Sequence, residues 1–246
     1  MEEKFEFTSS EWNETQILLD KLKISIGRTL KPDDEEKIRS YITYAIQNNQ
    51  IQRDVFGLNP ILNSLQTAEI AVEEIGMKRD GILAILLYNS VIDGYADEKL
   101  IEKLFGENVA HIIHGLARIH ELYKKNPVVE SENFRNLLIS FAEDMRVILI
   151  MIADRMNLMR QIRDTTKVDA KREVSEEASY LYAPLAHKLG LYQLKSELEE
   201  IAFGELHKEA HDSIVARVNF LREQGTNIVP KIIEQLNKDM KDNGIK

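Results

Sequence analysis

Apolar residues recur at helical spacing along almost the whole chain, and the strict alternation that marks a half-buried strand is rare. This periodicity predicts a series of amphipathic helices. Their expected ranges are 62–75, 80–93, 97–105, 108–125, 131–143, 145–163, 170–188, 192–206 and 208–241. With two further helices nearer the N-terminus, the pattern predicts an all-α fold of about ten helices.

Local start and stop signals place the remaining elements. Ser10, followed by two glutamates, predicts the cap and first turn of a helix that ends near Ile26. Pro32 and the acidic residues after it predict a second helix start, because negative charge is favoured in the first turn. The segment 57–60 predicts a turn. Helix ends or tight turns are expected at Gly76, Gly106 and Gly190.

Composition limits the class of protein. The 246 residues include 5 prolines and 11 glycines and contain no repeat or low-complexity linker, so we expect one domain over residues 1–246. Apolar residues (43%) and charged residues (30%) stand in the ratio of a folded globular protein. The lack of cysteine excludes disulfides and thiolate metal sites. A net charge of -9 argues against direct nucleic-acid binding.

No targeting or membrane segment is expected. The first twenty residues are rich in glutamate and lack the apolar core of a signal peptide. The longest apolar run, Val147 to Ala153, is too short to cross a bilayer. We therefore expect a cytoplasmic location and no membrane partner.

Two stretches carry a family resemblance. The first runs from Asn133 to Arg160 and places Asp154 at the end of a very apolar segment with arginines on both sides. The second is Tyr-Ala-Pro-Leu-Ala-His-Lys-Leu-Gly and its continuation, from Tyr182 to Phe203. Both are similar to the hydrolase half of the RelA/SpoT enzymes, which make and destroy (p)ppGpp in the stringent response. The resemblance implies a helical domain of the HD superfamily over 1–246, ending at the border of a synthetase domain that the chain lacks.

The resemblance also implies a metal site. In this family a histidine, a His-Asp pair and a later aspartate hold one divalent metal, usually manganese, which activates the water that attacks the 3′ pyrophosphate. The corresponding residues here are Asn63, Tyr88, Asn89 and Asp154. A Glu-Asp pair that assists the family's reaction corresponds to Ile92 and Asp93, and a later His-Asn pair to Asn157 and Leu158.

These replacements predict that the metal is lost. Neutral amides supply no charge, and Tyr88 would have to ionise far below its usual pKa of about 10 to bind a cation. Only Asp93 and Asp154 remain as catalytic remnants. We expect no cofactor and no intact hydrolytic site, as in the pseudo-hydrolase domains of synthetase-dominated relatives.

A nucleotide site is a separate question. Arg53, Asp154 and Arg155 are the candidate contacts for (p)ppGpp, GDP or GTP, although the position that matches the family's guanine-stacking arginine holds Asp54. The alternative is that Asp154 and Arg155 belong to structural ion pairs, with Arg146 and Arg160 as partners. The pairs His111/His114 and His207/His211 have helical spacing but are predicted to be ordinary helix-surface side chains. The methionines at 151, 156 and 159 are predicted core residues.

Three functions are compatible with this pattern. The first is a regulatory module that packs on the synthetase domain of the same protein and biases its state. The second is an active or atypical (p)ppGpp hydrolase that would have to use Asp93 and Asp154. The third is a folding scaffold or dimerisation unit.

Overall fold

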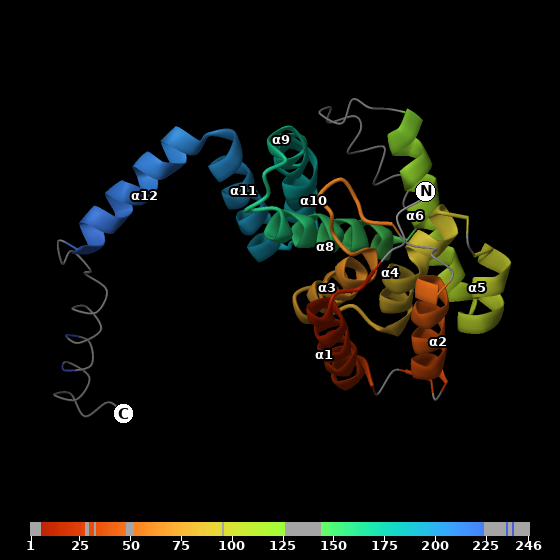
Figure 1. Ribbon diagram of the computed structural model, residues 1–246. Coiled ribbons are helices and arrows are strands. Elements are labelled where there is room, and N and C mark those ends of the chain that lie inside the picture. Colours follow the sequence, from red (N-terminus) through yellow and green to blue (C-terminus); the bar gives the residue numbers. More distant parts are fainter. Residues whose placement is uncertain are drawn as a thin grey trace. The chain divides into compact units, whose positions relative to one another are not determined.

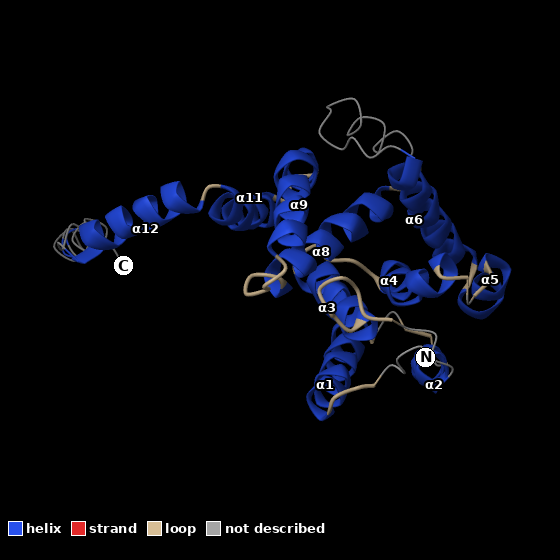
Figure 2. Cartoon of the chain, turned by 45° about the horizontal axis from the view of Figure 1, so that its top comes forward, coloured by secondary structure: helices blue, strands red, loops and turns tan. Residues whose placement is uncertain are grey.

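The computed structural model describes residues 6–27, 30–31, 33–47, 52–94, 96–125 and 144–223, together with 235 and 238. All regular structure in these ranges is helical, and they contain no strand (Figure 2). The all-α prediction is therefore confirmed. The predicted helix over 131–143 and the end of the one over 208–241 lie outside the described residues.

The helices follow the predicted order (Figure 1). They are α1 (Ser9–Ile26), α2 (Asp34–Gln47), α3 (Pro60–Glu73), α4 (Arg79–Ile92), α5 (Glu98–Phe105), α6 (Glu107–Lys125), α8 (Met145–Gln161), α9 (Val168–Glu177), the π-helical turn η1 (Ala178–Tyr182), α10 (Ala183–Lys188), α11 (Tyr192–Leu206) and α12 (Lys208–Glu223).

The N-cap of the first helix lies two residues before the one that the sequence predicted. Thr8, not Ser10, is the N-cap, because its hydroxyl accepts the Glu11 amide at 3.2 Å while the Glu11 carboxylate accepts the Thr8 amide at 2.8 Å. The predicted turn before α3 is present, and there Asn59 caps the helix by accepting the next two amides. The predicted glycine positions are also confirmed, since Gly76, Gly106 and Gly190 all have positive φ.

The single helix predicted over 170–188 is divided in the structure. Its middle widens into η1, where the Ala183 amide donates to the Ala178 carbonyl, five residues back. Pro184 follows directly and has no amide to donate, so it cannot continue an ordinary α-helical ladder. The wider turn accommodates this proline and sets Tyr182, its last residue, against the neighbouring helices.

Helix α8 lies at the centre of the helical packing, against α3, α4, α6 and α10. Its Val147, Ile148, Ile152, Ala153, Met156 and Met159 side chains are completely buried. The approach of α6 is close, because a Cβ added at Gly115 would lie 2.7 Å from a methyl group of Val147. Two of the three predicted core methionines are thus confirmed, and the third, Met151, lines a cavity.

A buried ion pair joins α2 to α4. Arg79 donates to both carboxylate oxygens of Asp34, at 2.5 and 2.7 Å, and the Asp34 side chain is completely buried. Asp34 also accepts the Lys31 amide, and Arg79 also donates to Asp80. This network holds α2 on the body of the protein.

The contacts of the chain fall into two units, Met1–Ala202 and Phe203–Lys246. The first contains the core described above. In the second, the Phe203 ring packs on the rings of His207 and His211, with centroid distances of 5.4 and 6.1 Å. The single domain expected from the sequence stays a prediction. None of the helices in the described ranges has both the length and the apolar character needed to span a bilayer.

Candidate functional site

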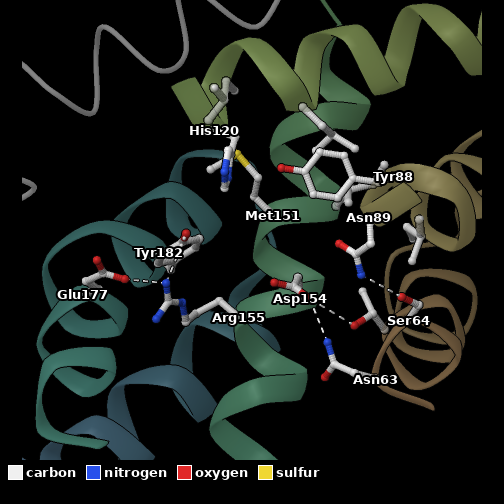
Figure 3. Close-up of a pocket in the computed structure, with 15 residues that line it drawn as sticks. Asn63, Ser64, Tyr88, Asn89, His120, Met151, Asp154, Arg155, Glu177 and Tyr182 are labelled. Carbon is white, nitrogen blue, oxygen red and sulfur yellow. Dashed lines mark hydrogen bonds and ion pairs between the residues drawn. The ribbon is translucent and has the colours of Figure 1, made fainter. Parts of the chain in front are cut away.

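A cavity of about 410 Å³ lies between α3, α4, α6, α8, the end of α9 and η1. Its walls combine aliphatic side chains with a group of polar ones (Figure 3). Volume and lining are those of a small-molecule site, which is mostly apolar and has a few convergent polar groups.

The structure brings all four predicted metal-ligand positions to this one cavity. Asn63 comes from α3, Tyr88 and Asn89 from the last turn of α4, and Asp154 from α8. Helix α4 is buried from Gly81 to Leu87, and its polar contribution to the cavity comes where its residues become half-exposed, at Tyr88 and Asn89. Residues separated by 91 positions, Asn63 and Asp154, are therefore in contact.

Asp154 is held by hydrogen bonds from α3. Its Oδ1 accepts the Asn63 side-chain amide at 3.5 Å and the Thr67 hydroxyl at 3.4 Å. The Asp154 side chain is exposed to the space of the cavity, but the carboxylate lies below the protein surface with protein atoms around it. Burial raises the pKa of Asp154 above its ordinary value, and Arg155 and the two hydrogen bonds oppose this only in part.

Buried Asn157 fixes the α3 side of the site. Its amide donates to the side-chain oxygen of Asn63 at 2.8 Å and to the Thr67 hydroxyl at 3.2 Å. Gln161 donates to the same Asn63 oxygen at 2.8 Å. The Asn63 oxygen therefore faces two donors within the protein, and its amide faces Asp154.

The α4 side of the site is neutral. Burial, and then the charge of Asp154, raise the pKa of the Tyr88 hydroxyl, so this group keeps its proton. The Asn89 amide donates to the Ser64 hydroxyl at 3.5 Å. Neither side chain supplies the negative charge of the His-Asp pair that the family carries here.

This donor set does not fit a divalent metal. Manganese and related ions prefer carboxylate oxygens and neutral imidazole, and the four positions offer one carboxylate, two amides and a protonated phenol. The other carboxylate of the lining, Glu177, pairs with Arg155, and its one imidazole is His120. The described residues include no group of three or more histidine, cysteine, aspartate or glutamate side chains placed to hold a metal ion.

Arg155 lies on the side of the cavity formed by α9 and η1, where it contacts other side chains of the protein. It pairs with Glu177, and its guanidinium stacks on the Tyr182 ring at 4.4 Å from the ring centre (Figure 3). The alternative of structural ion pairs therefore holds for Arg155, but the two arginines considered as partners pair with other residues. Arg146 pairs with Asp144, and Arg160 pairs with Glu74 and Glu197. The arginines of α8 are thus neutralised by nearby carboxylates and form no open basic surface.

Arg53 does not line the cavity. It pairs with Glu11 at 2.8 Å and donates to the carbonyls of Glu6 and Gly57. The structure therefore brings Asp154 and Arg155 together but leaves the third candidate nucleotide contact elsewhere.

Asp93, the other predicted remnant, lines a second cavity of about 210 Å³ between α2, α3 and α4. Burial raises the pKa of Asp93 above its ordinary value. Ser64 and Asn89 line both cavities, so their hydrogen bond stands between Asp93 and Asp154.

Sequence reasoning missed five polar residues of the larger cavity: Ser64, Thr67, His120, Glu177 and Tyr182. His120 lies on the face of α6 that lines the cavity. Its spacing from buried Leu116, one helical turn earlier, was the available signal. His111 and His114 are exposed, as predicted, and His114 contacts Glu98 at 3.2 Å.

Comparisons with known proteins agree with this placement. A family model described as HD domain matches residues 42–192, more than half of the chain. GTP pyrophosphokinase rsh of Brucella melitensis is 31% identical over 219 residues, covering 88% of this chain and 29% of that protein. Guanosine-3′,5′-bis(diphosphate) 3′-pyrophosphohydrolase of Aquifex aeolicus is 30% identical, covering 84% and 30%. Bifunctional (p)ppGpp synthase/hydrolase SpoT of Escherichia coli K12 is 29% identical, covering 89% and 31%.

The chain therefore spans less than a third of the length of these curated relatives. The matched segment includes every cavity residue discussed above, from Asn63 to Tyr182. The resemblance to RelA/SpoT enzymes inferred from the sequence is confirmed, and the chain belongs to the HD domain family.

Proposed function

We propose that this chain is a catalytically degenerate (p)ppGpp hydrolase domain that regulates an alarmone synthetase. The observation that carries the proposal is the content of the cavity. Four positions that hold a metal in the family meet at one point, and three of them carry Asn63, Tyr88 and Asn89. The family's reaction needs a metal cation to activate the attacking water, and this donor set does not attract such a cation.

The proposed role is conformational. The side chains around the proposed degenerate site are fixed by other residues. Asn157 and Gln161 donate hydrogen bonds to Asn63, and Glu177 forms an ion pair with Arg155. A rigid domain can bias a neighbouring domain when it packs better on one of that domain's states than on the other. The names of the relatives, GTP pyrophosphokinase and synthase/hydrolase, indicate that the neighbouring domain would be a synthetase.

Hydrolysis is tested by restoring the family's ligands. The chain and the variant Asn63→His/Tyr88→His/Asn89→Asp are each incubated with ppGpp and manganese, and pyrophosphate release and bound manganese are measured. We expect no release and no stoichiometric manganese with the natural chain, and manganese binding with the variant.

Manganese-dependent release by the natural chain, abolished by Asp154→Asn, would instead establish an atypical hydrolase and refute the degenerate site. Regulation is tested by joining residues 1–246 to a synthetase domain and comparing its GTP pyrophosphokinase rate with and without them. An unchanged rate contradicts the regulatory role.

A further inference from the structure

Three oxygen atoms in the larger cavity have no hydrogen-bond partner among the described residues. They are the Tyr88 hydroxyl, the Asn89 side-chain carbonyl and the second carboxylate oxygen of Asp154, since the hydrogen bonds of these side chains use the Asn89 amide and the first Asp154 oxygen. Figure 3 shows the three side chains around the same space. Two of these atoms only accept hydrogen bonds, and the hydroxyl can accept or donate.

The charge of the cavity points in the same direction. Arg155 and Glu177 face each other across an ion pair and cancel. The remaining formal charge in the lining is the carboxylate of Asp154. His120 is the other basic side chain of the lining and is counted as neutral here. A phosphate group would be repelled by the Asp154 carboxylate, whereas a cation would be attracted to it.

The rest of the wall is apolar. Ile85, Leu116, Ile119, Ile150 and Met151 enclose the space beside Asp154, and the Tyr88 ring adds an aromatic face. A volume of about 410 Å³ accommodates a charged head together with several carbon atoms. Apolar walls around a single carboxylate suit a ligand with one cationic end and a short apolar stem.

We propose that this cavity binds a small organic cation, an ammonium or guanidinium group on a short apolar stem, at the place where the family holds its metal. The N–H groups of such a cation would donate to Asp154, Asn89 and Tyr88. An organic cation needs only one opposite charge here, because its remaining N–H groups are satisfied by neutral oxygens. This inference rests on the proposed loss of the metal and names the ligand class of the same cavity.

The test is calorimetric titration of the chain with n-butylamine and n-butylguanidine, with n-butanol as the uncharged control of equal stem length. The variants are Asp154→Asn, which removes the charge but keeps the shape, and Tyr88→Phe, which removes one hydroxyl. Glu102→Gln is the matched control, because Glu102 is an exposed carboxylate on α5 that does not line the cavity. Circular dichroism verifies that each variant is folded.

We expect both cations to bind and n-butanol not to bind. Asp154→Asn should weaken binding roughly tenfold or more, the loss of one charge-assisted interaction, and Tyr88→Phe by a smaller factor. Glu102→Gln should bind as the natural chain does. Absence of heat with either cation at millimolar concentration, or equal affinity in Asp154→Asn, would overturn the inference.

Failure of this inference is distinguishable from failure of the proposed function. Manganese-dependent hydrolysis of ppGpp by the natural chain refutes the degenerate site and the organic-cation site together. Lack of cation binding in a chain that also fails to hydrolyse ppGpp refutes the cation site alone.

Discussion

Replacing Arg79 with methionine should destabilise the protein by about 3–5 kcal/mol, because it leaves the buried Asp34 carboxylate without its partner. The Asp34 side chain has no exposed surface and the Arg79 side chain is 9% exposed. Both guanidinium hydrogen bonds to this carboxylate are short, at 2.5 and 2.7 Å. Methionine fills the space of the arginine stem, so the loss reports the charge and the hydrogen bonds rather than a cavity.

The size of the effect follows from burial. An exposed ion pair contributes about 0.2–1 kcal/mol, because water replaces it when it breaks. Asp34 lacks that alternative, and the Lys31 amide is its other hydrogen-bond donor. A loss of 3–5 kcal/mol in a domain of about 200 residues corresponds to a fall in Tm of roughly 6–20 °C.

Urea unfolding followed by circular dichroism measures the change. Arg172→Met is the control, since Arg172 forms an exposed pair with Glu176 one helical turn away, and it should lose less than about 1 kcal/mol. The double variant Asp34→Asn/Arg79→Met should be more stable than Arg79→Met alone, because no charge is then buried. A loss for Arg79→Met no larger than for Arg172→Met would refute the reasoning.

The same pair gives a pH dependence. Burial alone would raise the pKa of Asp34, but hydrogen bonds from Arg79 and the Lys31 amide hold it below its ordinary value. The contribution of this group to stability is therefore present above its unfolded pKa of about 3.9 and is lost as the pH falls through the folded pKa. The difference in stability between the natural chain and Arg79→Met should shrink in acid.

Three further outcomes are expected. The pKa of Asp154 is raised in the fold, so its contribution to stability is present below its ordinary pKa and is lost as the pH rises through the folded pKa. The Tm of Asp154→Asn relative to the natural chain should therefore rise between pH 4 and pH 8. A constant difference in Tm would contradict this. Gly115→Ala should lose about 1–3 kcal/mol in urea unfolding, because the new methyl group meets the stiff side chain of Val147, whereas Gly81→Ala should lose less, since the flexible methionine beside it can move. Arg160→Ala should lose about 1 kcal/mol in thermal unfolding at low salt, and a similar loss in concentrated salt would argue against its two ion pairs as the cause.

The helices and their ends follow from the sequence because they depend on neighbours in the chain. Apolar spacing predicted α3, α4, α6 and α8 to within a few residues, and glycine predicted the turns at positive φ. Where prediction failed, two local signals competed. Thr8 and Ser10 could both cap α1, and only Thr8 has a glutamate three residues later to complete the capping box.

The candidate site was likewise predicted from the sequence only in part. The order of polar residues along the chain, read against the family, was enough to name Asn63, Tyr88, Asn89 and Asp154, and packing brings them to one cavity. The ion pairs could not be predicted from the sequence, because their partners lie on helices that are far apart in the chain. Arg155 is held by Glu177 on another helix, and Arg53 by a glutamate of α1, 42 positions away. Periodicity fixes the face that a side chain occupies, but the partner across that face is decided only when the helices pack.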